Sequence, residues 1–154
     1  MAAECVILIG LPASGKTTFY RDRFTETHSH VSKDLLRNNR RSARRQEELI
    51  AESLAQGRSV VIDNTNATVQ VRAPLIALAR AHGATVVGYY FATEAADALR
   101  RNRTRQGPER VPDVAIFAIR KRLEPPSLGE GFDRLFGVAL DEGKRSFEVV
   151  PYSR

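Results

Sequence analysis

Short apolar runs recur along the chain and predict β-strands. They fall at residues 5–10, 30–32, 59–63, 84–91 and 147–150, and stretches with helical character separate them. Strands buried on both faces of a parallel sheet have this near-continuous apolar character. The alternation therefore predicts an α/β protein with a mostly parallel sheet and helices on both faces. The closing segment, 137–150, predicts a hairpin that turns at Asp-Glu-Gly.

One helix is predicted between the second and third strands. Leu36, Ala43, Ile50 and Leu54 recur at helical spacing and form one narrow apolar stripe. Gly57 is expected to end this helix, because glycine adopts the left-handed conformation that closes many helices.

Turn and capping residues predict three further helices. Pro74 suits the first turn of a helix better than its interior, so a helix is expected at residues 73–82 with Gly83 as its cap. The next helix is expected to begin after Thr93 as its N-cap. The last is expected at residues 113–124, where two prolines halt it.

Composition indicates one folded domain covering residues 1–154. The chain is 42% hydrophobic and 27% charged, and it has no apolar run near the roughly 20 residues of a membrane span. The N-terminal apolar run is too short for a signal peptide, and the single cysteine, Cys5, has no internal disulfide partner, so a cytoplasmic location is expected. A formal net charge of +6 favours polyanionic partners.

The strongest chemical signal is the sequence GLPASGKTTF at residues 10–19. Gly10 and Gly15 free the backbone so that successive N–H groups converge on an anion, Lys16 adds a positive charge, and Thr17 offers a hydroxyl to Mg²⁺. A helix starting here directs its positive dipole end at the phosphates. An ordinary glycine-rich turn would not need Lys followed by Thr. The residues expected to contact ATP are Gly10, Pro12, Ala13, Ser14, Gly15, Lys16, Thr17 and Thr18.

The sequence SKDLLR at residues 32–37 is the first candidate for the acceptor side. Asp34 follows a short strand and opens a helix, at the sheet edge where ligands collect. Its carboxylate could accept a proton from an attacking hydroxyl, and Arg37, one turn later, could clamp a phosphate. Alternatively, Asp34 serves only as a helix N-cap.

The sequence VVIDNTN at residues 60–66 is the second candidate. Asp63 ends a strand beside the phosphate loop, where a carboxylate reaches Mg²⁺ directly or through water. Asn64, Thr65 and Asn66 add short polar side chains at the same edge. The same four residues are also typical of an ordinary turn.

Two arginine-rich segments carry the remaining signals. Residues 100–105 predict a lid, within about 93–112, that brings positive charge to the transferring phosphoryl group; a solvated helix end is the alternative. In residues 37–45, Arg37, Arg41, Arg44 and Arg45 share one flank and fit a polyphosphate strand, although Glu47, Glu48 and Glu52 allow partial internal pairing.

Other residues indicate less. His28, His30 and His82 show no metal-ligand spacing, and structural roles are expected for them. Tyr89, Tyr90 and Phe91 lie on a predicted buried strand, so core packing is favoured over base stacking. The chain has no Asn-Lys-x-Asp pattern, which argues against a GTPase switch.

Together, GLPASGKTTF, SKDLLR, VVIDNTN, RNRTR and RVPDVAIFAIRKRLEPPSLGEGFD resemble the P-loop kinase domain of the 5′-hydroxyl polynucleotide kinases of the phage and DNA-repair type. The likeness covers nearly the whole chain in the same order. It implies an adenylate-kinase-like P-loop NTPase, a three-layer sandwich with strand order 2-3-1-4-5 and a helical lid. The phosphatase domain that often accompanies this kinase is absent from these residues, so 3′-end healing is not expected.

The resemblance also implies roles for site residues. Asp34 would be the general base, Arg37 with Thr65 would hold the acceptor's adjacent phosphate, and Asn64 would support Arg37. The lid residues Arg101 and Arg105 would serve ATP together with Lys16 and Thr17. The phage-type enzyme has an acid at the position of Asn64, which weakens the inference about Arg37.

The expected activity is ATP- and Mg²⁺-dependent transfer of the γ-phosphoryl group to a 5′-hydroxyl of DNA or RNA. Asp34, Lys16 and Arg105 are the expected catalytic residues, with Thr17 and Asp63 as metal ligands. Arg37, Asn64, Thr65, Arg41 and Arg44 are expected to bind the acceptor. The alternatives are a kinase for a sugar, nucleoside or antibiotic hydroxyl, and an ATP-binding module without its own transferase activity.

Overall fold

The computed structural model describes residues 2–36 and 40–153. Six strands of these residues form one sheet in the order β2-β3-β1-β4-β5-β6, parallel throughout except for the β5–β6 pair. The expected order 2-3-1-4-5 is confirmed, and β6 adds an antiparallel edge by the predicted hairpin. The strands are β1 (Glu4–Gly10), β2 (His28–Val31), β3 (Ser59–Asp63), β4 (Thr85–Phe91), β5 (Arg134–Asp141) and β6 (Ser146–Pro151).

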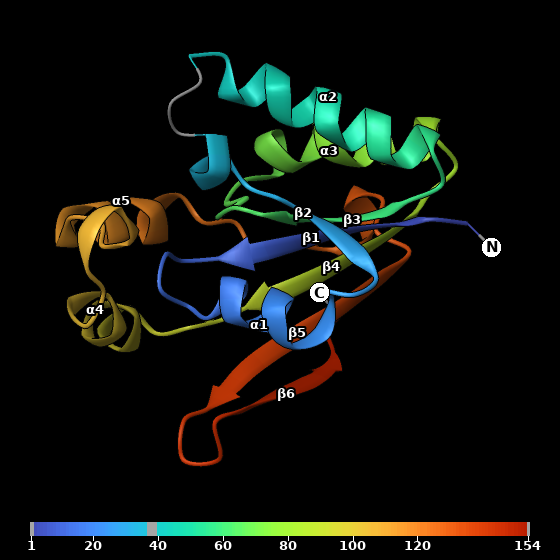
Figure 1. Cartoon of the computed structure of the whole chain (residues 1–154). Helices are drawn as coiled ribbons and strands as arrows, with labels where there is room; N and C mark the ends of the chain where they lie inside the picture. The colour runs from blue at the N-terminus through green and yellow to red at the C-terminus, as the bar shows by residue number, and fades with distance from the viewer. Residues whose placement is uncertain (1, 37–39, 154) are drawn as a thin grey trace.

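The helices complete a three-layer sandwich (Figure 1), which confirms the predicted fold class. Helices α2 and α3 cover one face of the sheet, α1 covers the other, and α4 and α5 stand beyond the carboxyl end of β1. None of the described helices is long and apolar enough to cross a membrane. The helices are α1 (Lys16–Arg23), α2 (Ser42–Ala55), α3 (Val69–Ala81), α4 (Ala95–Arg103) and α5 (Asp113–Arg122), with short 3₁₀ turns η1 (Lys33–Leu36), η2 (Gly107–Glu109) and η3 (Leu128–Glu130).

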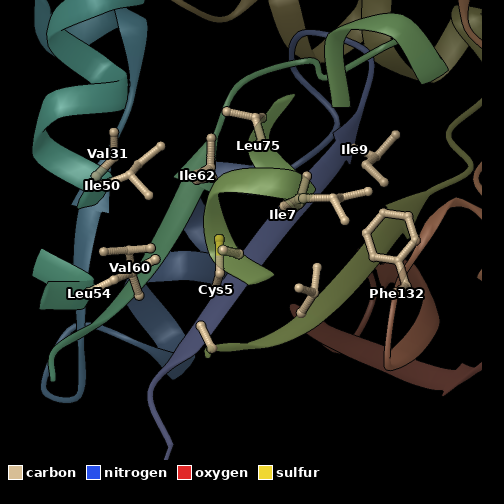
Figure 2. Packing of buried hydrophobic residues seen from close by; sticks show 14 of the residues in the cluster. Cys5, Ile7, Ile9, Val31, Ile50, Leu54, Val60, Ile62, Leu75 and Phe132 are labelled. Carbon is tan, nitrogen blue, oxygen red and sulfur yellow. The ribbon is translucent and has the colours of Figure 1, made fainter. Parts of the chain in front are cut away.

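Strand β1 is the centre of the core because both of its faces are covered. Cys5, Ile7 and Ile9 pack beneath α2 and α3 (Figure 2), whereas Val6 and Leu8 pack against the aromatic side chains of α1. All five side chains are fully buried. Side chains that alternate between the two faces of β1 therefore contribute to both apolar layers. The loop that follows Gly10 thus begins at the end of the central, fully covered strand.

The predicted helix through Leu36 is wrong in its first half. Leu36 ends the turn η1, and α2 begins only at Ser42. Ile50 and Leu54 are buried as predicted, but Ala43 is exposed. The stripe was extended too far because helical spacing alone does not show where a chain leaves one helix and starts the next.

Helix α3 also differs from the prediction, because it begins at Val69 and holds Pro74 in its interior. Thr68 caps it by accepting a hydrogen bond from the Val71 amide at 3.1 Å. Proline removes one donor, to the carbonyl of Gln70, but both residues are exposed and water can satisfy that carbonyl. In α4 the N-cap is Glu94 rather than the predicted Thr93.

Candidate functional site

The phosphate loop joins β1 to α1 and requires glycine at both predicted positions. A Cβ on Gly10 would lie 2.9 Å from the Cβ of Phe91 and 3.0 Å from the Ser14 hydroxyl. Gly15 has a φ of +98°, a left-handed conformation that side chains disfavour. The loop is therefore pressed against the end of β4 and turned so that α1 starts at Lys16.

Lys16 lies inside this loop and is buried. Its Nζ donates to the carbonyls of Gly10 at 2.9 Å and Leu11 at 2.6 Å, and to the Ser14 hydroxyl at 3.3 Å. Burial lowers the pKa of Lys16 to about 8, the charges of Asp63 and Asp34 oppose this shift, and Arg105 adds to it. Since the ammonium's hydrogen-bond partners here are neutral oxygens, its charge is available to an anion that enters the loop.

Thr17 and Asp63 form a direct hydrogen bond across the sheet edge. The Thr17 hydroxyl donates to Asp63 Oδ2 at 2.7 Å, and Asp63 is only 5% exposed. Burial raises the pKa of the Asp63 carboxyl, but hydrogen bonds from His30 and Thr17 and the charge of Lys16 outweigh it and hold that pKa below its usual range. A hydroxyl beside an ionised carboxylate is the oxygen set that suits Mg²⁺, so the predicted metal residues fit the ion.

His30 is a site residue that the sequence did not reveal. Its Nε2 lies 2.8 Å from Asp63 Oδ2, the same oxygen that accepts from Thr17. The His30 ring stacks on Tyr20 with centroids 4.1 Å apart, which fixes its orientation. The expected purely structural role is therefore incomplete, because His30 orients a carboxylate of the site. The available signal was its place near the end of a parallel strand beside β3.

A cavity of about 290 Å³ opens at the carboxyl edge of the sheet and gathers most of the predicted site. Its walls come from the phosphate loop, η1, the end of β3, the segment after α4 and helix α5. Its lining residues are Pro12, Ala13, Lys16, Thr17, Lys33, Asp34, Asp63, Asn64, Thr65, Arg105, Glu109, Val111 and Ile119.

A second cavity of about 330 Å³ lies between α1, β2 and η1. It shares Thr17, Asp34, Arg105 and Glu109 with the first cavity and also contacts Thr18. Asp34 therefore borders both spaces. Asp34 lies in the first turn of the four-residue η1, and Arg41 is the N-cap residue of α2, so Asp34 is not the N-cap of α2.

Asn64 ties the turn that carries Asp34 to the rest of the fold. Asn64 Oδ1 accepts a hydrogen bond from the Lys33 amide at 2.9 Å, and Asn64 Nδ2 donates to Gln46 Oε1 at 2.6 Å. The Ser32 hydroxyl accepts from the Asp34 amide at 3.2 Å. Asn64 was expected to support Arg37, which lies outside the described residues; its visible partners are the η1 backbone and Gln46.

The loop after β3 is held to the phosphate loop by a buried network. The Gly10 amide donates to the Thr65 carbonyl at 3.0 Å, and Asn66 Nδ2 donates to the Leu8 carbonyl at 2.7 Å. Arg72, which is fully buried, donates to the Asn66 carbonyl at 2.8 Å and pairs with Glu130 at 2.8 Å. This network keeps Asp63 and Thr65 in register with the phosphate loop.

The two arginines of the predicted lid, Arg101 and Arg105, occupy different environments. Arg101 pairs with Glu142 of the β5–β6 hairpin at 2.8 Å, and its Nη1 lies 3.5 Å from the Ala13 carbonyl of the phosphate loop. Arg105 lines both cavities and donates to the Glu109 carbonyl at 3.1 Å. Of the two arginines of the predicted lid, Arg105 lines the cavities, and Arg101 contacts the phosphate loop from outside them.

The predicted acceptor residues Arg41 and Arg44 line neither cavity. Arg44 pairs with Glu48 at 3.5 Å, and Arg45 pairs with Glu48 at 3.0 Å and with Glu52 at 3.6 Å. The internal pairing that the sequence left open therefore occurs in α2, and it neutralises part of this cationic row.

A model of the AAA domain family matches residues 5–126. The chain belongs to this AAA domain family.

Two curated relatives support the resemblance to polynucleotide kinases. The bifunctional polynucleotide phosphatase/kinase of Schizosaccharomyces pombe is 28% identical to this chain over a 133-position alignment that covers 84% of this chain and 32% of that protein. The putative bifunctional polynucleotide phosphatase/kinase of Acanthamoeba polyphaga mimivirus is 29% identical to this chain over a 159-position alignment that covers 98% of this chain and 37% of that protein. The chain thus spans about a third of the length of these relatives.

Solved structures confirm the fold of the AAA domain. A putative kinase from Chloroflexus aurantiacus superposes with a TM-score of 0.71 at 19% identity, covering 95% of this chain and 92% of that one. A fungal RNA kinase superposes with a TM-score of 0.67 at 17% identity, covering 92% of this chain and 40% of that one. A gluconokinase from Sinorhizobium meliloti superposes with a TM-score of 0.63 at 19% identity, covering 90% of this chain and 83% of that one. The comparisons support a P-loop kinase, a class that implies ATP use, and they include both polynucleotide and small-molecule kinases.

Proposed function

We propose that this AAA domain is an ATP- and Mg²⁺-dependent kinase that transfers the γ-phosphoryl group to the 5′-hydroxyl of DNA or RNA. The observation that carries the proposal is the shared cavity of Asp34 and Lys16. Asp34 is also one of the charges that raise the Lys16 pKa, so the two groups are electrostatically coupled. A phosphate seated on Lys16 and a hydroxyl beside Asp34 would therefore meet within one space. The relatives named as polynucleotide phosphatase/kinases favour a nucleic-acid acceptor.

The donor side would be formed by the phosphate loop. Its amides and Lys16 would bind the phosphates, and Arg101 and Arg105 would add positive charge from a lid formed by residues 93–112. Thr17 and Asp63 would hold Mg²⁺, which would neutralise phosphate charge.

On the acceptor side, Asp34 would accept the proton of the 5′-hydroxyl. The hydroxyl oxygen would form a bond to the γ-phosphorus while the bond from that phosphorus to the bridging oxygen breaks, giving ADP and a 5′-phosphate. Asn64 and Thr65, with Arg37, would hold the acceptor's first phosphate. Positioning and charge neutralisation would supply most of the acceleration.

Exchange of Asp34→Asn tests this assignment, since it removes the base and keeps the shape of the side chain. Transfer from labelled ATP to a 5′-hydroxyl oligonucleotide should fall at least about 100-fold. ATP affinity should stay within about twofold, because Asp34 stands on the acceptor side. Asp22→Asn, on the exposed surface of α1, is the matched control and should behave as the wild type.

A panel of acceptors separates the polynucleotide kinase from its nearest rival. The gluconokinase neighbour and the internal pairing in α2 favour a small-molecule acceptor as the second candidate. Transfer to sugars or nucleosides with no transfer to oligonucleotides would establish that rival. If Asp34→Asn keeps transfer within about tenfold of the wild type, a loss of only ~1.4 kcal/mol, Asp34 is not the base.

A further inference from the structure

The outer surface of helix α5 exposes large apolar side chains that the site does not use. Val114 is 72% exposed and Phe117 is 49% exposed. They border an open hollow of about 620 Å³ together with Ala118, Arg120 and Lys121, and these five residues define what we call the α5 face. Val114 and Phe117 are one helical turn apart and border the same hollow, so together they form an apolar patch, the kind of surface feature that marks interaction sites.

The α5 face lies on the far side of the helix from the site. Ile119 lines the first cavity, and at about 100° per residue Phe117 and Lys121 both lie about 160° away around the helix axis. A helix with its side chains is about 10–12 Å across. A strand that starts in the cavity and follows the surface of α5 through this angle would travel about 14–17 Å. At 3.4 Å per stacked nucleotide, it would reach the α5 face after about four to five nucleotides.

The charge of the α5 face distinguishes it from the cationic row of α2. Within the described part of the chain, no ion pair joins Arg120 or Lys121 to a carboxylate, whereas Arg44 and Arg45 are both paired with glutamates. Asp113, the acid in the first turn of α5, pairs with Arg103 of α4 and not with the cations of the α5 face: its Oδ2 lies 3.9 Å from Arg103 Nη2. Arg120 and Lys121 follow the exposed ring of Phe117 by three and four residues, and among the described residues neither cation has an acidic partner.

We propose that the α5 face binds the acceptor strand, as a single-stranded polynucleotide, about four to five nucleotides from the reacting 5′ end. An exposed aromatic ring stacks on any base, and flanking cations contact the phosphates between bases. This proposal rests on the proposed function and adds a second contact point remote from the transfer site. A purely apolar docking surface for a protein would not need the two unpaired cations.

Acceptor length provides the test. Phe117→Ala and Lys121→Ala are compared with two matched exposed residues at the far edge of the molecule, Val150→Ala and Lys144→Ala in the β5–β6 hairpin. Each protein is assayed for kcat/KM with a nucleoside 3′-monophosphate and with a 12-nucleotide single strand, both carrying a 5′-hydroxyl. Anisotropy of a labelled strand of the same length, with no ATP present, measures binding directly, and thermal unfolding checks that the variants are folded.

The expected result is selective for the long acceptor. Phe117→Ala and Lys121→Ala should each lower kcat/KM and affinity for the 12-nucleotide strand about fivefold to tenfold and leave the nucleoside 3′-monophosphate unchanged, while the two controls change neither. Lys121→Ala should also reduce the slope of log affinity against log salt by about one.

Equal losses on both acceptors, or no loss on either, would overturn the proposal. It also fails if Phe117→Ala converts a dimer to a monomer in sedimentation without changing strand binding, because the face would then serve protein contact. If the wild type transfers phosphate to neither acceptor, the proposed function fails; the α5 face still stands if the strand binds and Phe117→Ala weakens that binding.

Discussion

Arg72 offers the sharpest test of how the fold supports the site. It is fully buried, and its guanidinium pairs with Glu130 at 2.8 and 3.1 Å and donates to the Asn66 carbonyl at 2.8 Å. Exchange of Arg72→Met keeps much of the volume but removes all three contacts. Glu130 is only 7% exposed, so its charge would remain buried without the partner.

The magnitude follows from this geometry. Breaking one side of a buried pair costs about 3–5 kcal/mol. For a chain of this size that is a fall of roughly 6–20 °C in the melting temperature. Arg44→Met is the matched control, because Arg44 is 70% exposed and pairs with Glu48 at 3.5 Å, a contact that contributes about 0.5 kcal/mol or less.

Urea denaturation of four proteins measures the effect as a double-mutant cycle: wild type, Arg72→Met, Glu130→Gln and the double variant. Glu130 also accepts from the Ser127 amide at 2.9 Å, so the Glu130 variant carries a cost of its own, which the cycle subtracts. The expected coupling energy is about 2 kcal/mol or more. A coupling energy below about 0.5 kcal/mol, or a loss for Arg72→Met no larger than for Arg44→Met, would refute the reasoning.

Two further predictions concern buried titratable groups. Burial lowers the pKa of Lys16 to about 8, so the free protein loses this charge as the pH rises above 8. If the phosphates require the ammonium, ATP binding should take up protons near pH 8.5 and few protons at pH 6.5, and ATP affinity should weaken by up to about tenfold per pH unit above 8. Calorimetry in buffers of different ionisation enthalpy measures the proton uptake. The absence of proton uptake at pH 8.5 would contradict the role of Lys16. Burial raises the pKa of the Cys5 thiol to about 12, so an aromatic disulfide reagent at pH 8 should modify Cys5 no faster than the protein unfolds, which comparison with the unfolding rate in urea checks.

The parts of the fold that the sequence predicted depend on local signals. The run from Cys5 to Ile9 is short, apolar throughout and followed by glycine, and the structure buries every one of its side chains. The phosphate loop could also be predicted from the sequence. Gly10 is required because other chain atoms approach it closely, and Gly15 is required because its backbone is left-handed. The β5–β6 hairpin could be predicted because turn residues separate two apolar runs.

The supporting residues of the site were missed because their partners are distant in sequence. His30 reaches Asp63 across 33 positions, Gln46 reaches Asn64 across 18, and Arg72 reaches Glu130 across 58. Each is a polar residue with no periodic or motif signal of its own. These contacts arise only in the folded chain, where β2 lies beside β3, α2 contacts β3 and η3 contacts α3.

The two halves of the candidate site differ in how firmly the fold holds them, and this difference bears on where substrate choice is made. Lys16 and Asp63 are buried. Lys16 is fixed by hydrogen bonds within the phosphate loop, and Asp63 by hydrogen bonds to Thr17 of α1 and His30 of β2. Asp34 is exposed, on a four-residue turn whose backbone amides donate to the side chains of Asn64 and Ser32. A change in η1 or at the start of α2 would therefore alter the acceptor side at little cost to stability, whereas the donor side cannot change without disturbing β1 and β3. Under the proposed function, the identity of the acceptor is thus to be sought in η1, α2 and the proposed α5 face, and not in the phosphate loop.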